Sequence, residues 1–229
     1  MDKGMWDRWA PASGILFVVS ALVAYGLAGN IPGSDASTSE ITSYIESHHG
    51  RMLTAAVLIG FGTLFFVWFL ASLAAILRKA GEPRLASVAY GAGLVVAGIF
   101  MWFAVIFGAL AFSIAGAGDD GITKAIYDLQ WPLGVLITIP VASLALATSV
   151  AGMRAKVLPE WLAWVGTAAA IAFAIGSTTW SEGSGFWSPD GGYSMIIFFV
   201  FLGWTAVVSG VLVARPAEAE LPAAAAQPM

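Results

Sequence analysis

The chain has 229 residues, of which 59% are hydrophobic and only 10% are charged, and its formal net charge is −4. Soluble domains carry about 25% charged residues, so the composition excludes an ordinary soluble fold. The sequence contains no cysteine, which excludes disulfides and thiolate metal sites, and the acidic balance without a basic patch argues against a nucleic-acid partner.

Apolar runs of bilayer length recur along the whole sequence. They predict an all-α fold: a polytopic membrane protein with six transmembrane helices in one bundle. The predicted spans cover residues 13–29, 52–77, 85–115, 132–152, 160–180 and 193–214. The tail 216–229 is rich in alanine and proline without apolar periodicity, and it is predicted to be disordered.

The connection between the first two spans carries the signals of a short amphipathic helix. Ser37 and Glu40 have the spacing of a capping box, and an apolar stripe at helical spacing runs from Ile41 to His48. Gly50 fits the C-terminal cap of such a helix. We therefore expect a separate helix that lies on the membrane surface or on the bundle.

The third span has a face of small residues that predicts close helix packing. These residues are Ala89, Gly93, Ala97, Ala104, Gly108 and Ala111. The connection that follows is predicted to contain a second short amphipathic helix, capped by Asp119 or Asp120. One face of that helix is apolar and consists of Ile122, Ala125, Ile126 and Leu129.

The fourth span contains the best candidate for a ligand site inside the membrane. Pro140 leaves the carbonyl of Leu136 without its helical partner and bends the helix. The hydroxyls of Thr138 and Ser143 lie close by in sequence and are able to line a cavity. The alternative is a bend that shapes packing, with the hydroxyls bonded to their own helix. A small, weakly polar stripe of Thr138, Ala142, Ala145 and Ser149 is expected to face protein.

Three tryptophans lie well inside the predicted spans, whereas the others lie near span ends, where interfacial aromatic residues are common. Trp68, Trp102 and Trp204 are candidates for a pocket that binds an apolar or aromatic ligand. Packing within the bundle or contact with acyl chains is the alternative.

Polar residues in the connections offer candidates for metal binding or acid–base chemistry. They are His48, His49, Asp119, Asp120, Glu182 and Asp190. Adjacent histidines on a helix point about 100° apart and so rarely bind the same ion. Solvated loop charge is the alternative, and we expect no metal site, no catalytic residue and no cofactor.

The charges are divided between the two ends of the predicted bundle. The terminal segments and the turns 78–84 and 154–156 hold eight of the ten lysines and arginines, whereas the other three connections hold eight acidic residues and two basic ones. By the positive-inside rule, both termini are expected in the cytoplasm.

Three stretches resemble a known family. They are RMLTAAVLIG with FFVWFLASL in the second span, IYDL before the fourth, and LPEWLAWVG at the fifth. They are similar to an uncharacterised family of small six-helix integral membrane proteins, a domain of unknown function common in high-GC bacteria. The resemblance implies six helices and a bacterial inner-membrane location, and it brings no activity or site residue.

The centre of every predicted span lacks an ionisable residue. Such a residue costs at least about 2.5 kcal/mol there and usually marks an ion path or a proton relay. We therefore expect a non-catalytic bundle that binds lipid, a membrane protein partner or further copies of itself. A transporter or pore for a small uncharged or apolar solute is the alternative, and a membrane enzyme with an acidic extracytoplasmic site is the second.

Overall fold

The computed structural model describes residues 10–114 and 118–214. Within these residues, six helices are long and apolar enough to cross a membrane, and none of the residues forms a strand. The predicted all-α polytopic architecture is therefore confirmed. The predicted disordered tail, 216–229, lies outside the described residues.

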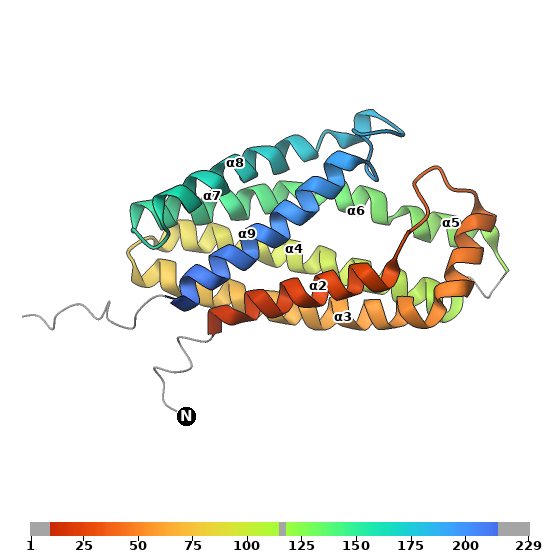
Figure 1. Cartoon of the computed structure of the whole chain (residues 1–229), viewed down its shortest axis with the longest axis horizontal. Coiled ribbons are helices and arrows are strands. Elements are labelled where there is room, and N and C mark those ends of the chain that lie inside the picture. Colours follow the sequence, from red (N-terminus) through yellow and green to blue (C-terminus); the bar gives the residue numbers. More distant parts are fainter. Residues whose placement is uncertain (1–9, 115–117, 215–229) are drawn as a thin grey trace, which may run out of the picture.

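The helices run mostly along one long axis (Figure 1). In chain order they are η1 (Ala10–Ala12), α2 (Ser13–Ala28), α3 (Thr38–Lys79), α4 (Pro83–Ala109), the π-helical segment η2 (Leu110–Ile114), α5 (Asp120–Asp128), α6 (Gln130–Leu136), α7 (Thr138–Arg154), α8 (Glu160–Gly176), η4 (Thr179–Ser181) and α9 (Gly192–Ala214). Figure 1 shows α5, α6 and α7 following one another along this axis, opposite the single long helix α3.

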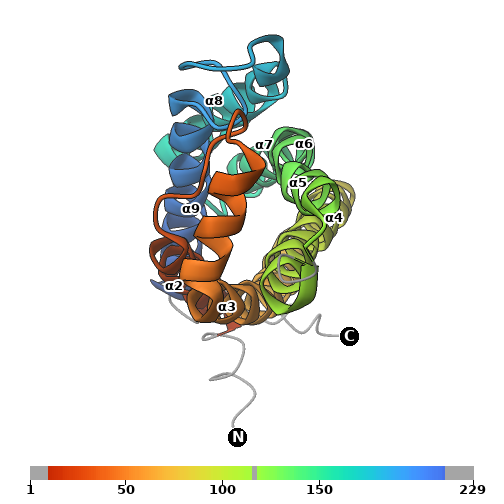
Figure 2. The same ribbon diagram turned by 90° about the vertical axis from the view of Figure 1, so that its right-hand side faces the viewer.

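Helix α3 corrects the prediction of a separate amphipathic helix. The capping box of Ser37 and Glu40 is present and begins α3, but the helix continues through Gly50 for 42 residues. A glycine inside a helix costs only about 1 kcal/mol, and buried Ile45 and Met52 on either side of Gly50 are packed in one apolar cluster. At 1.5 Å per residue α3 contains ~63 Å of helix, but it is not one straight rod, because Figures 1 and 2 show its first part turned steeply from the rest across the end of the bundle.

The fourth predicted span is divided at Ile137 into α6 and α7. Pro140 is the third residue of α7, where its missing N–H leaves the Leu136 carbonyl without the usual helical donor. The backbone stays helical at Ile137, whose N–H donates to the Leu133 carbonyl at 3.0 Å, so the interruption is the loss of one helical hydrogen bond. The buried Thr138 hydroxyl donates to the Val135 carbonyl at 2.7 Å beside it.

The six long helical units form a closed ring. Helix α2 packs on α3, α3 on α4, α4 on α7, α7 on α8, α8 on α9, and α9 on α2, and the ring is visible from the end in Figure 2. Phenylalanine rings fill its centre: Phe66 of α3 lies 4.7 Å from Phe17 of α2 and 5.9 Å from Phe201 of α9, between ring centroids. Phe100 of α4 joins the same cluster.

Small residues let the helix backbones approach, as the sequence predicts for the third span. A Cβ on Gly93 of α4 would overlap the Leu70 side chain of α3. A small residue likewise allows α8 to pack closely against both α7 and α9. A Cβ on Gly176 would lie 2.7 Å from Ile197 of α9 and 3.3 Å from Thr138 of α7. The small stripe on α7 faces protein as expected, since Thr138, Ala145 and Ser149 are buried.

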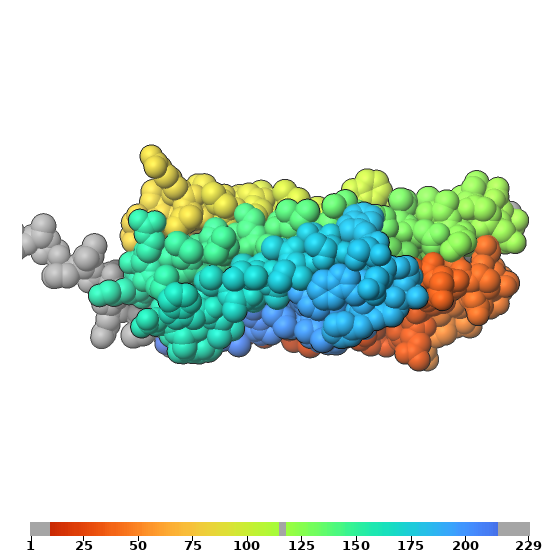
Figure 3. All heavy atoms as spheres, turned by 90° about the horizontal axis from the view of Figure 1, so that it is seen from above, coloured from red at the N-terminus to blue at the C-terminus, as the bar shows by residue number. Residues whose placement is uncertain are grey.

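The two ends of the ring differ in charge and construction. The basic end holds the turns 80–82 and 155–159, which an ion pair of 3.2 Å between Glu82 and Arg154 connects. The opposite, acidic end holds the loops 29–37 and 182–191. There α3, η2 and α5 extend beyond the other helices, and Figure 3 shows their orange and green atoms projecting past the blue loop. We call residues 29–52, 110–114 and 119–131 the acidic-end cap.

Candidate functional site

The acidic-end cap has a hydrophobic core of its own, separate from that of the bundle. Buried Ile41, Ile45 and Met52 of α3 pack with Leu110 of η2 and Tyr127 of α5. Ile41, Leu110 and Tyr127 have no exposed surface. The cap is therefore a folded structure that holds its surface residues in fixed positions.

Side-chain hydrogen bonds hold the loop 29–37 against this core. The Tyr44 hydroxyl donates to the Ala28 carbonyl at 2.6 Å, and the Tyr127 hydroxyl donates to the Pro32 carbonyl. The Lys124 ammonium donates to the Ala36 carbonyl at 3.3 Å and pairs with Asp128 at 3.1 Å. The loop backbone is thus fixed at successive points by residues of α3 and α5.

Asp190 connects this loop to the last loop of the chain. Its carboxylate accepts from the Ser34 backbone N–H at 2.9 Å and from the Ser188 hydroxyl at 2.6 Å. Partial burial acts to raise the pKa of Asp190, but the hydrogen bonds from Ser188 and Ser34 outweigh it, and the pKa lies below its usual value. The ionised carboxylate is therefore the form that joins the two loops.

An open pocket of about 390 Å³ lies on the outer surface of the same loop. It is lined by Asn30, Pro32, Gly33, Asp35, Ala36 and Glu40. The Glu40 carboxylate accepts from the Ser37 backbone N–H at 2.8 Å, so it is already engaged in capping α3. The Asp35 side chain is exposed. The pocket is an open, polar depression at the acidic end of the molecule.

Helix α5 exposes most of the apolar face that the sequence predicts, whereas Ile126 of that face packs against the cap core. Its buried residues are Thr123 and Tyr127, whereas Ile122 is 53% exposed, Leu129 is 45% exposed and Ala125 is exposed. The cap therefore presents Ile122, Ala125 and Leu129 as an exposed apolar stripe at the acidic end of the bundle.

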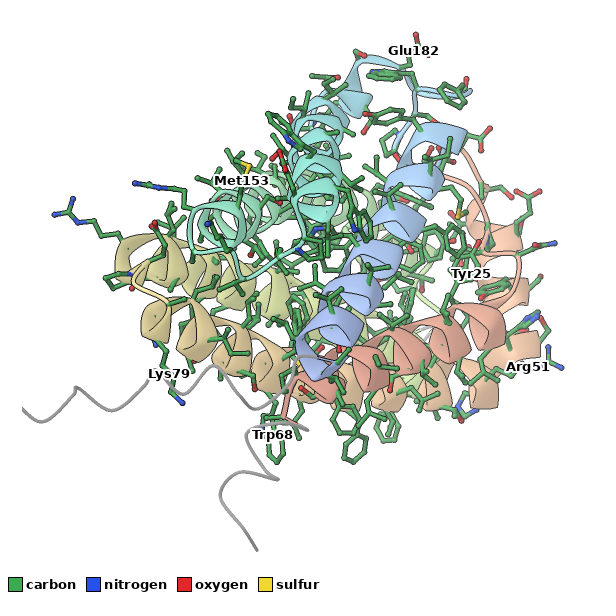
Figure 4. All side chains as sticks on the ribbon, turned by 60° about the vertical axis from the view of Figure 1, so that its left-hand side comes forward. Tyr25, Arg51, Trp68, Lys79, Met153 and Glu182 are labelled. Atoms are coloured by element: carbon green, nitrogen blue, oxygen red, sulfur yellow. The ribbon has the colours of Figure 1, made fainter. Side chains whose placement is uncertain are left out.

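The structure does not bring the predicted intramembrane candidates together around one cavity. Thr138 is buried and bonded within its own chain segment, while Pro140 and Ser143 are half-buried on α7. Figure 4 shows Trp68 pointing away from the bundle, and the Trp68 and Trp102 side chains are 49% and 58% exposed. Trp204, in contrast, is buried on α9.

Four of the predicted polar candidates lie in the cap, each in a local role. The His48 ring stacks on Tyr44 with centroids 4.5 Å apart, and its Nδ1 lies 3.0 Å from the Tyr44 carbonyl. His49 is exposed. Asp119 caps α5 by accepting from the Ile122 N–H at 3.0 Å, and Asp120 is exposed in its first turn. Among the residues that the structure describes, no three His, Asp or Glu side chains converge as metal ligands do.

Sequence reasoning missed the two tyrosines, Tyr44 and Tyr127, that hold the loop 29–37, and it named Asp190 only as a polar candidate in a connection. Tyr127 stands off the apolar stripe of α5, and the local pattern does not show that it is buried. The contact between Asp190 and Ser34 spans 156 residues and leaves no local signal. Comparison with protein-family models, with curated proteins and with solved structures finds no match to this chain.

Proposed function

We propose that this chain is a non-catalytic integral membrane protein that binds a protein partner at its acidic-end cap. The observation that carries the proposal is the outward apolar stripe of α5, formed by Ile122, Ala125 and Leu129. Isolated apolar residues on a surface are ordinary, but apolar residues gathered on one face of an ordered helix indicate a contact surface. The pocket beside Asp35 supplies a polar rim at the same end of the molecule.

The packing of the bundle supports a binding role over a pore. Phe17, Phe66 and Phe201 occupy the centre of the ring with centroids 4.7–6.0 Å apart. The large exposed side chains of α4, such as Val95 and Trp102, face the surroundings of the bundle, where membrane lipids are their natural partners.

We place the protein in the bacterial cytoplasmic membrane with both termini in the cytoplasm. The resemblance to the bacterial six-helix family supports the location. The basic end, with Arg78, Lys79 and Arg84, supports the orientation through the positive-inside rule. The cap then faces away from the cytoplasm.

Single cysteines test this orientation, because the natural sequence contains none. Asp120→Cys at the acidic end is expected to react with an impermeant maleimide in intact cells, and Arg84→Cys is expected to react only after the cells are opened. The orientation is wrong if the accessibility of the two positions is reversed.

Photo-crosslinking tests the binding surface. A photoreactive phenylalanine analogue in place of Ile122 is expected to capture one protein in intact cells, and the mass of the product shows whether it is a second copy or another protein. His49, which is exposed on α3 in the same cap, and Val95, which is exposed on α4, are the matched controls. Equal products at all three positions, or lipid adducts alone at Ile122, contradict the proposal.

Transport of a small uncharged solute is a second candidate. Pro140 leaves the Leu136 carbonyl without its helical donor inside the fourth spanning segment. Carbonyls freed in this way within spanning helices contribute to substrate sites in transporters. Uptake of neutral solutes into proteoliposomes tests it. A rate equal to that of empty liposomes for wild type excludes this function for the solutes assayed.

A further inference from the structure

Two turns at the basic end of the bundle form one positively charged surface. The turn 80–82 joins α3 to α4, the turn 155–159 joins α7 to α8, and the ion pair between Glu82 and Arg154 connects the two turns. The described residues of these turns and of the helix ends beside them include five exposed basic side chains and two acidic ones. The basic residues are Arg78, Lys79, Arg84, Arg154 and Lys156, and the acidic residues are Glu82 and Glu160. We call this set the basic surface.

The two turns have the same backbone structure. In each turn, an N–H just beyond the helix end donates to the carbonyl five residues earlier, at 3.0 Å in the first turn and 2.7 Å in the second. This is the Schellman motif, which needs one residue with a left-handed backbone and usually has glycine there. Gly81, with φ 92°, occupies that position in the first turn, and Lys156, with φ 53°, occupies it in the second.

Lys156 is the unusual member of this pair. Among the residues that the structure describes, it is the only one besides glycines with a positive φ. A left-handed backbone is strained for a residue with a side chain, whereas it is not strained for glycine. The backbone of the turn gives no reason for a lysine, since Gly81 meets the same requirement without strain. A residue held in a strained conformation supports the hypothesis of a function, and Lys156 adds an exposed positive charge to the basic surface.

The position of the basic surface indicates membrane phospholipid as its partner. Two spanning segments end here, in α3 and α7, and two begin here, in α4 and α8, so the charges lie where lipid headgroups meet the protein. Trp161 and Trp164 at the start of α8 are 58% and 60% exposed, and tryptophans favour the border between headgroups and acyl chains. Val165 and Ile171 continue this exposed face along α8. A lipid with its headgroup on the basic surface therefore has an apolar helix face for its acyl chains.

We propose that the basic surface binds the headgroup of an anionic phospholipid, and that the acyl chains of this lipid lie along the exposed face of α8. Basic residues gathered beside the ends of spanning helices attract anionic headgroups, whereas a neutral headgroup has no net charge to match them. The basic surface and the acidic-end cap lie at opposite ends of the bundle, and Figure 4 shows Lys79 and Arg51 near these two ends. The proposal therefore does not depend on the function proposed for the cap.

Native mass spectrometry of the full-length, detergent-purified protein tests the proposal. Titration with phosphatidylglycerol, and with phosphatidylcholine of the same acyl chains, gives the dissociation constant of the first bound lipid. One lysine or arginine near a membrane surface changes the affinity for anionic lipid about fivefold. Arg84→Gln is therefore expected to weaken phosphatidylglycerol binding about fivefold and to leave phosphatidylcholine binding unchanged. Equal affinity of the wild-type protein for the two lipids overturns the proposal.

A second variant and a control show whether the basic surface is the site. Lys156→Gly removes a charge and gives the second turn the residue that the first turn has, so the helical circular-dichroism spectrum is expected to stay unchanged while phosphatidylglycerol binding weakens. Arg51→Gln is the matched control, because Arg51 is an exposed arginine of α3 at the acidic end, and it is expected to change neither affinity.

Three results overturn the proposal. The first is unchanged phosphatidylglycerol binding in Arg84→Gln or in folded Lys156→Gly. The second is an equal loss in Arg51→Gln, which would mean that overall charge and not the basic surface determines binding. The third is displacement of phosphatidylglycerol by millimolar inorganic phosphate, which would identify a soluble anion as the occupant.

Discussion

The bundle and the acidic-end cap are held together by different interactions. In the bundle, aromatic rings such as Phe66 and Phe201 meet at the centre, and glycines such as Gly93 allow close backbone contact. In the cap, the hydroxyls of Tyr44 and Tyr127 bind loop carbonyls. The difference follows from the surroundings: a helix in lipid satisfies its own backbone, whereas a loop needs side chains or water to do so.

The largest expected effect comes from the centre of the bundle. Phe66→Ala removes a fully buried ring with neighbours on α2, α4 and α9, and it is expected to lower the free energy of unfolding by about 3–5 kcal/mol. Reversible unfolding in mixed micelles measures this change. Phe61→Ala on the same helix is the control, because Phe61 is 58% exposed. Equal losses for the two variants would show that the central rings do not hold the bundle together.

An intermediate effect is expected in the cap. Tyr127→Phe keeps the buried ring but leaves the Pro32 carbonyl without its donor, which is expected to cost about 1–2 kcal/mol. Hydrogen exchange of residues 29–37 measures the loss as faster local opening, while exchange in α7 and α8 stays unchanged. Tyr25→Phe is the matched control, since the exposed Tyr25 hydroxyl donates only to the Met195 sulfur. Faster exchange throughout the bundle would mean that the cap and the bundle unfold together.

The smallest effect is expected at the connection between the two loops. Asp190→Asn replaces the carboxylate that accepts from the Ser34 N–H with a neutral amide. It is expected to speed hydrogen exchange at the Ser34 amide without a detectable change in global stability. Because the pKa of Asp190 is lowered in the folded protein, its stabilising contribution is present above the unfolded pKa of about 3.9 and is lost as the pH falls through the folded value.

Exchange at Ser34 in wild type, corrected for intrinsic rates, should therefore approach that of Asp190→Asn only below about pH 4. Glu182→Gln is the control in the same loop, and Figure 4 shows Glu182 at its tip. A wild-type rate that already equals the variant's at neutral pH would show that the carboxylate does not hold the loop.

The sequence predicts the parts of this fold that depend on local patterns. The spans follow from apolar length, and the capping box of Ser37 and Glu40 marks where α3 begins. The end expected at Gly50 is wrong, because glycine is also tolerated within a helix and only the packing on either side decides whether the helix continues.

Local sequence patterns do not show which face of a helix packs against the rest of the protein. The helical spacing of the apolar residues in α5 shows that the helix is amphipathic, but it does not show that Tyr127 faces inward and Ile122 outward. Likewise, Trp68 and Trp204 stand in equally apolar spans, and lipid is as apolar as the interior of the bundle. Their opposite placement, 49% against 4% exposed, depends on which neighbours each helix has.

Closure of the ring has a consequence for biosynthesis. Helix α9 packs on α2, and near the basic end the Ser209 hydroxyl of α9 donates to the Pro11 carbonyl beside the start of α2. Because α2 is translated before α9, it enters the membrane without the helix that covers this side of it in the folded protein. Until α9 is translated, lipid, the insertion machinery or a chaperone must cover the polar and apolar groups on that side of α2.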